Sequence, residues 1–298
     1  MNEARLASIL ESLQSPVPET QVLGLQQAMS EQIPVDQLRE PLLALLRAPA
    51  GDTRWLAVKM LSDAASHSGA DMTPFLGALG SLSSDTHTLS WAPMVWTVGE
   101  LAVGVTIRQW INTGRWDEVT AMAHAGEQQM KSVLQSATSV RGKVDLSPLL
   151  PVLESALTHT ESELRGLASR ALTTWCAWKD RWSDVEVLLQ SSDYAVRWYA
   201  IVALDDAAED EVDVSAILPS LIEVLGHPNE TLEKDRNVRY TQTLRQSAAN
   251  VLVWHMLKAL GGKAVTGRKP FEVAGVDLRQ IPEVRAAIRE MRAIARDR

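Results

Sequence analysis

The sequence lacks most of the features that mark disulfide-linked, secreted or membrane-spanning proteins. Its single cysteine, Cys176, has no second cysteine with which to form a disulfide. No run of about 18 or more apolar residues is present, which excludes a hydrophobic helix that spans a bilayer. The N-terminal residues lack the basic segment and the long apolar run of a secretory signal peptide. These absences predict a soluble, cytoplasmic protein.

Sequence motifs for catalysis, metal binding and nucleotide binding are also missing. The six histidines do not fall in a metal-ligand spacing with one another or with Cys176. There is no Gly-x-Ser-x-Gly, no phosphate-binding glycine-rich loop and no His-Glu-x-x-His. Six acidic residues lie between Asp205 and Asp213, but they lack the glycine and the spacing of a calcium loop, which favours a solvated loop. We therefore predict no enzymatic activity, no cofactor and no metal.

Phenylalanine and tyrosine are scarce, since they total five residues against ten tryptophans. The net charge of −8 argues weakly against a nucleic-acid partner and weakly for a basic protein partner. Hydrophobic residues still make up 46% of the chain, which is enough for a folded core. The chain is therefore expected to be globular or repetitive, and its many tryptophans need a structural explanation.

One spacing of apolar residues recurs along the chain and predicts the fold. In residues 193–204, the positions −1, +3, +6 and +7 relative to Arg197 are apolar. They fall on one side of a helix, because each residue turns a helix by about 100°. The same spacing follows three other arginines: Arg54, Arg165 and Arg245. It returns less completely from three further residues: Val22, Trp91 and Glu127. A unit of this kind buries its apolar stripe only by stacking on its neighbours, which predicts a solenoid of repeats.

Residues 193–204 also carry an Asp, a Val-Arg pair and an Ala-Leu pair, and this order resembles the second helix of the HEAT repeats. The resemblance covers about residues 17–257, with an insertion at 227–242. It implies an all-α fold, a right-handed α-α superhelix (α-solenoid) of about six to seven helical hairpins. We expect the solenoid to span residues 1–257, a linker to span 258–280 and a C-terminal capping helix to span 281–298.

HEAT proteins are mostly binding scaffolds, so the resemblance implies a protein–protein interaction module of the scaffold, inhibitor or immunity type. In HEAT repeats the second helices line the concave side, and positions +1, +4, +5 and +8 lie opposite the buried stripe. Five apolar residues there are the predicted partner-binding residues: Trp55, Trp96, Trp198, Ile201 and Val202. If they face solvent, replacing Trp55 and Trp198 with alanine leaves the fold nearly intact. Alternatively, these tryptophans pack between the helices of adjacent repeats.

A second possible function is a nucleic-acid enzyme similar to the HEAT-like alkylpurine DNA glycosylases. Those enzymes use aromatic and carboxylate residues in a basic concave groove. The predicted concave positions here hold only Lys59, Lys131 and Arg170 as bases, with Asp205 as an acid. A groove that follows a DNA backbone needs more positive charge than this. No nucleic-acid partner is expected.

Overall fold

The computed structural model describes residues 3–67, 70–89, 96–140, 144–226, 247–253, 272–273, 276–277, 280–286 and 288–289. The chain consists of two compact units, Met1–Val140 and Arg141–Arg298. The predicted all-α fold is confirmed. Strands in the described residues are limited to the two-residue β1 (Glu272–Val273) and β2 (Val276–Asp277), which pair antiparallel. No described helix has both the length and the apolar character needed to cross a membrane.

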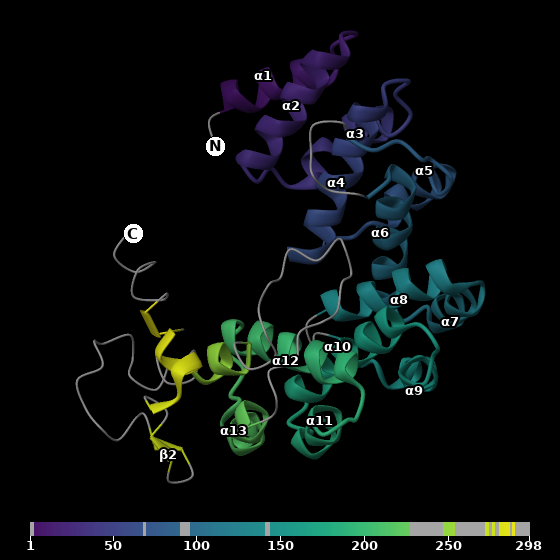
Figure 1. Cartoon of the computed structure of the whole chain (residues 1–298). Helices are drawn as coiled ribbons and strands as arrows, with labels where there is room; N and C mark the ends of the chain where they lie inside the picture. Colours follow the sequence, from purple (N-terminus) through teal and green to yellow (C-terminus); the bar gives the residue numbers. More distant parts are fainter. Residues whose placement is uncertain are drawn as a thin grey trace. The chain divides into compact units, whose positions relative to one another are not determined.

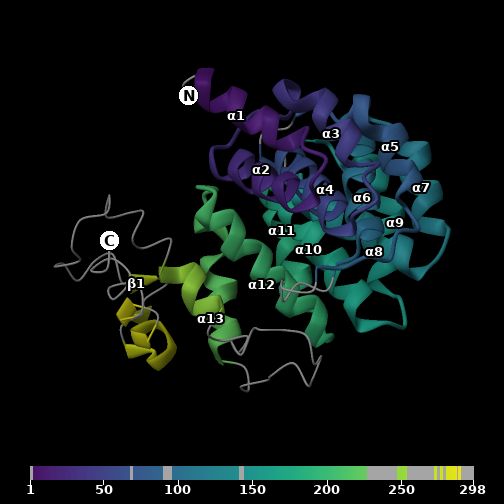
Figure 2. The same ribbon diagram turned by 90° about the horizontal axis from the view of Figure 1, so that it is seen from above.

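The first unit is a row of helical hairpins whose second helices lie side by side in the order α2, α4, α6, α8 (Figures 1 and 2). Its elements are α1 (Glu3–Leu13), α2 (Pro18–Ser30), η1 (Val35–Leu38), α3 (Arg39–Leu45), α4 (Gly51–His67), η2 (Thr73–Phe75), α5 (Leu76–Ser81), α6 (Val98–Asn112), α7 (Trp116–His124) and α8 (Glu127–Ser139). The weaker sequence repeats are confirmed in two of these helices, because Leu25 and Ala28 of α2 and Val133 and Leu134 of α8 are buried.

The second unit continues the hairpin pattern, and α10 packs along α12. Its elements are η3 (Ser147–Leu149), α9 (Leu150–Leu157), α10 (Ser162–Trp178), α11 (Trp182–Leu189), α12 (Tyr194–Glu209), η4 (Ser215–Ile217), α13 (Leu218–Gly226) and the helical residues 247–253. The predicted stripe of α12 is confirmed, because Ala200, Ala203 and Leu204 are fully buried. A Cβ atom at Gly166 would overlap the ring of Tyr199, so glycine permits the close approach of the two helices.

Four of the second helices, α2, α6, α10 and α12, end in a common turn. After α2, Ile33 N–H donates to the Ala28 carbonyl (3.0 Å) and Gln32 N–H donates to the Met29 carbonyl (3.1 Å). This is a Schellman turn, whose penultimate residue takes a left-handed conformation. The equivalent residues after α2, α6, α10 and α12 all have positive φ: Gln32, Gly114, Asp180 and Glu211. Only one of them is a glycine, so the turn is kept by its hydrogen bonds and by the packing of the next segment.

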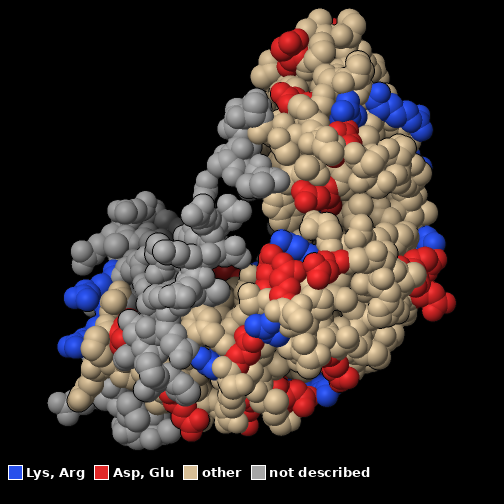
Figure 3. Space-filling model, turned by 45° about the vertical axis from the view of Figure 1, so that its right-hand side comes forward, with Lys and Arg blue, Asp and Glu red and all other residues tan. Residues whose placement is uncertain are grey.

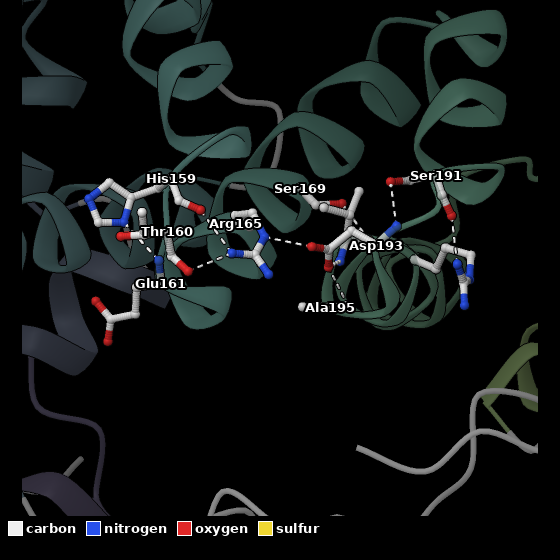
Figure 4. Close-up of polar contacts among 10 residues, drawn as sticks. His159, Thr160, Glu161, Arg165, Ser169, Ser191, Asp193 and Ala195 are labelled. Carbon is white, nitrogen blue, oxygen red and sulfur yellow. Dashed lines mark hydrogen bonds and ion pairs between the residues drawn. The ribbon is translucent and has the colours of Figure 1, made fainter. Parts of the chain in front are cut away.

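The arginine that marks a repeat in the sequence connects consecutive hairpins. Arg165 Nε donates to Asp193 Oδ2 (2.6 Å), and its Nη1 donates to the carbonyls of His159 and Thr160 (2.8 Å each), as Figure 4 shows. Asp193 Oδ1 also accepts from the N–H groups of Ala195 (2.8 Å) and Val196, which caps α12. One guanidinium therefore satisfies two loop carbonyls and the cap of the next second helix.

Arg54 makes the equivalent contacts in the first unit. Its Nε donates to Asp85 Oδ2 (2.7 Å), and its Nη1 donates to the carbonyls of Ala48 and Pro49 (2.8 Å each). Arg197 repeats part of the pattern, since its Nη1 donates to the Ser191 carbonyl (2.6 Å). The recurring arginine is therefore a structural residue, and its charge is used inside the hairpin stack.

The helix predicted to start at Trp91 begins later in the structure, because Trp96 and Thr97 are not helical. Thr97 is the N-cap of α6: its Oγ1 accepts from Glu100 N–H (3.1 Å), and Glu100 Oε2 accepts from Thr97 N–H (2.8 Å). The Thr-x-x-Glu spacing is the signature of this capping box, and it places the helix start at Val98. Residues 90–95 lie outside the described residues.

The predicted domain limits stay predictions. Most of the linker 258–280 and of the capping helix 281–298 lies outside the described residues, although 282–286 and 288–289 are helical. Arg245 also lies outside them, while Ala248, Val251 and Leu252 of its repeat are buried. The division of the chain after Val140 had no signal in the sequence repeats.

Candidate partner-binding site

Most of the residues predicted to bind a partner are buried. Trp55 and Trp198 are each 5% exposed, and Ile201 is 0% exposed. Val202 is half-buried, and Trp96 is 43% exposed. Partner binding by these residues stays a prediction, but the expected solvent exposure is wrong for Trp55, Trp198 and Ile201. The alternative, in which the tryptophans pack between helices, describes Trp55 and Trp198.

Contacts between neighbouring second helices explain this burial. Trp55 Nε1 donates to the Trp96 carbonyl (2.9 Å), which lies next to the start of α6. Ser169, at +4 from Arg165, donates its hydroxyl to the Val196 carbonyl of α12 (2.7 Å). The +1 and +4 positions therefore face the adjacent second helix. The apolar stripe in the sequence identifies one buried side of the helix, but it does not identify the sides that neighbouring hairpins cover.

The first unit contains a cavity of about 860 Å³ between α2, the segment that follows it and α4. Cavities that hold small ligands or peptide side chains usually measure about 300–1,000 Å³. The lining residues come from three consecutive parts of the unit: Ala28, Met29, Gln32, Ile33, Pro34, Val35 and Asp36; Lys59, Met60, Asp63 and Ala64; and Ala70. Nothing in the sequence pattern predicted this cavity.

The turn after α2 builds one wall of the cavity. The hydrogen bonds at Gln32 and Ile33 end the helix, and Pro34 prevents its continuation because proline has no N–H. The chain then enters η1, so that Ile33 and Val35 are each at most 4% exposed. The buried Ala28, with the half-buried Met29, makes the α2 side. The floor of the cavity is therefore apolar, and one of its methionines is partly exposed.

The α4 wall carries a pair of opposite charges. Lys59 Nζ lies 2.6 Å from Asp63 Oδ2, one helical turn away. Asp36, in the first turn of η1, has no ion-pair partner among the described residues. Of the three charged lining residues, Lys59 and Asp63 neutralise one another, and the Asp36 carboxylate can pair with a cation of a bound molecule.

A buried arginine of α6 is hydrogen-bonded to α4. Arg108 of α6 is 9% exposed, and it donates to the carbonyl (3.1 Å) and the hydroxyl (2.9 Å) of Ser62 and to the Gly104 carbonyl (3.2 Å). Burial lowers the pKa of Arg108, and the nearby Asp63 carboxylate opposes that effect. Sequence analysis missed this residue, although an arginine inside the apolar run 98–111 is a visible signal. Arg108 fixes α4 against α6 and so holds the cavity wall.

The acidic stretch that begins at Asp205 was predicted to be a loop, but α12 continues to Glu209. Asp206 pairs with Arg170 of α10 (2.6 Å). Burial, and then the Asp206 and Glu209 carboxylates, raise the pKa of Asp205 to about 7. Acids in the last turn of a helix also oppose the helix dipole. This end of α12 is therefore electrostatically unfavourable at neutral pH.

Asp205→Asn is expected to stabilise the second unit by about 1–2 kcal/mol at pH 8 and by about a third of that amount at pH 5. The unfolded carboxyl loses its proton near pH 4, whereas the folded one keeps it until about pH 7. The native state binds more protons in this window, so the parent loses stability as the pH rises. Urea denaturation at both pH values measures the difference, with Glu154→Gln at an exposed position of α9 as the control. An equal effect of Asp205→Asn at pH 5 and pH 8 contradicts the shifted pKa.

The nucleic-acid alternative gains no support in the described part of the chain. Of the three predicted basic residues, Lys59 pairs with Asp63 and Arg170 pairs with Asp206.

Cys176 is 2% exposed, and burial raises the pKa of its thiol to about 11, so the thiolate is scarce at neutral pH.

Comparison of the sequence with protein-family profiles and with curated proteins finds no match. Among solved structures, an engineered protein is 21% identical over 86% of this chain and 69% of its own, with a TM-score of 0.39. The protein YIBA_ECOLI is 11% identical over 98% and 93%, with a TM-score of 0.37. A mutant of Kap121p is 13% identical over 86% and 34%, with a TM-score of 0.36, so the chain spans about a third of its length. Likenesses this distant leave the function to be argued from the chain itself.

Proposed function

We propose that this chain is a cytoplasmic protein-binding module of the HEAT type, without catalytic activity of its own, that acts as a scaffold or as an inhibitor of its partner. The observation that carries the proposal is the cavity between α2 and α4. It is large enough for one or two side chains of a partner, and helices on both sides hold its walls. Side-by-side helices with an apolar depression suit the insertion of a side chain from another polypeptide.

The chemistry of the lining supports a protein partner. Met29 and Met60 lie on opposite walls, and methionine adapts its shape to different apolar side chains. The charged residues of the lining can orient a polar group at the edge of the bound segment. Acidic residues exceed basic ones, 37 against 29, and Figure 3 shows acids on the surface both alone and beside Lys or Arg. The excess favours a basic partner through faster association.

Filling the cavity tests the proposal. Ala64→Phe places a ring in the cavity and is expected to reduce capture of the partner from a native lysate by about tenfold or more, since a buried anchor side chain loses its site. The matched control is Ala121→Phe, at an exposed position of α7 in the same unit. Quantitative mass spectrometry of the captured proteins measures the ratio.

The melting temperature of each variant separates loss of binding from loss of fold. A folded Ala64→Phe variant that retains every protein captured by the parent and by Ala121→Phe contradicts binding at this cavity. Ala64→Leu adds a smaller side chain and is expected to give an intermediate loss of capture, which serves as the second variant if Ala64→Phe does not fold.

A further inference from the structure

We propose that the α2–α4 cavity recognises a partner segment that carries an apolar side chain next to a guanidinium or ammonium group, with the apolar group in the cavity and the cation at Asp36. The inference deepens the proposed function and rests on it. It follows from the distribution of apolar and charged atoms around the cavity.

The apolar part of the occupant follows from the floor. Ala28, Ile33 and Val35 are each at most 4% exposed and line the cavity from the α2 side. Met60, at 5% exposed, lines it from α4. A polar group placed here loses its hydration without gaining a hydrogen-bond partner from these four side chains. An aliphatic or aromatic side chain is therefore the group that fits the interior.

The cationic part follows from the charges at the cavity wall. Lys59 and Asp63 neutralise one another at 2.6 Å, so they add little net field to the site. Asp36 is exposed, and the described residues supply it with no ion pair. The remaining charge of the lining is thus a single negative one, and it lies beside the apolar floor. An occupant with a cation next to its apolar group satisfies both features at once.

The Lys59–Asp63 pair adds selectivity against acidic segments. A carboxylate that approaches the cavity meets Asp36 without compensation, and it can reach Lys59 only by competing with Asp63. Arg108 does not line the cavity and is occupied by Ser62 and Gly104, so it offers no second anion contact there. Negatively charged occupants are disfavoured relative to neutral ones, and neutral ones relative to cations.

Three small probes with the same hexyl chain test this order directly: hexylguanidinium, hexylurea and heptanoate. The reporters are the methyl signals of Met29 and Met60 in protein labelled at the methionine methyl carbons, assigned with Met29→Leu and Met60→Leu. Both signals are expected to move at about threefold to fivefold lower concentrations of hexylguanidinium than of hexylurea, as expected for one exposed charge pair. Heptanoate is expected to be the weakest, and added salt should reduce the differences.

Two variants assign the effect to the proposed groups. Asp36→Asn keeps the shape of the side chain and is expected to bring hexylguanidinium and hexylurea to the same midpoint. The matched control Asp117→Asn removes an exposed carboxylate from the first turn of α7 and should leave the parent ratio unchanged. Ala64→Phe should abolish the response to all three probes.

Methyl signals that respond to none of the probes, or respond to all three at equal concentrations, overturn the inference. A guanidinium preference that survives Asp36→Asn assigns the cation contact to another group and also overturns it. The probes require no partner protein, so this result is independent of the capture experiment. A positive probe result with no loss of capture in Ala64→Phe would reject the proposed function while leaving the cavity chemistry in place.

Discussion

Replacing Ala200 with aspartate is expected to lower the free energy of unfolding of the second unit by about 3 kcal/mol or more. Ala200 has no exposed surface and lies on the face of α12 that the repeat pattern assigns to the core. An aspartate there brings a charge, or a proton taken up to neutralise it, into an environment of apolar side chains. Urea denaturation at pH 7 measures the loss.

The control for this substitution is Val187→Asp, which places the same group on α11 of the same unit. Val187 is 68% exposed, so the change is expected to remain within about 0.5 kcal/mol of the parent. If Ala200→Asp unfolds at the same urea concentration as Val187→Asp, the helix register derived from Arg197 is wrong. If both variants lose several kcal/mol, the effect comes from the added negative charge itself rather than from burial.

The repeats could be predicted because they are local. The spacing of Ala200, Ala203 and Leu204 after Arg197 depends only on the period of a helix, so one segment of sequence contains all the information. The capping box at Thr97 and Glu100 is equally local, although the sequence analysis made no use of it. A local hydrogen-bonding signal gives a helix end more precisely than apolar composition does.

The candidate site could not be predicted because it is not local. Met29 and Met60 line one cavity because the turn at Gln32 ends α2 before η1, and because Arg108 fixes α4 against α6. Both the turn and the contact between α4 and α6 involve segments outside a single helix, so no single stretch of sequence specifies them. Arg54 shows the same limit in another way: the sequence identified it as a repeat marker, whereas its hydrogen bonds to Asp85 and two loop carbonyls depend on the next hairpin.

The tryptophans distinguish the two sequence-based interpretations most sharply, since an exposed Trp55 predicts an unchanged fold on substitution and a buried one predicts the opposite. Trp55→Ala is expected to lower the free energy of unfolding of the first unit by about 3–5 kcal/mol, because a ring that is 5% exposed leaves a large cavity. Trp55→Phe retains most of the ring but loses the hydrogen bond to the Trp96 carbonyl, and should cost about 1–2 kcal/mol. Urea denaturation measures both.

Trp96→Ala is the matched control, because Trp96 belongs to the same unit, is 43% exposed and contributes its backbone carbonyl to Trp55 whatever its side chain. It is expected to cost less than about 1 kcal/mol. A Trp55→Ala variant as stable as Trp96→Ala would return Trp55 to the surface and restore the original partner-binding face. The opposite result is a large loss of stability for Trp55→Ala alone, with capture of the partner retained by Trp96→Ala. Neither tryptophan would then be the exposed anchor that binding requires. The cavity between α2 and α4 would remain as the recognition site of the first unit.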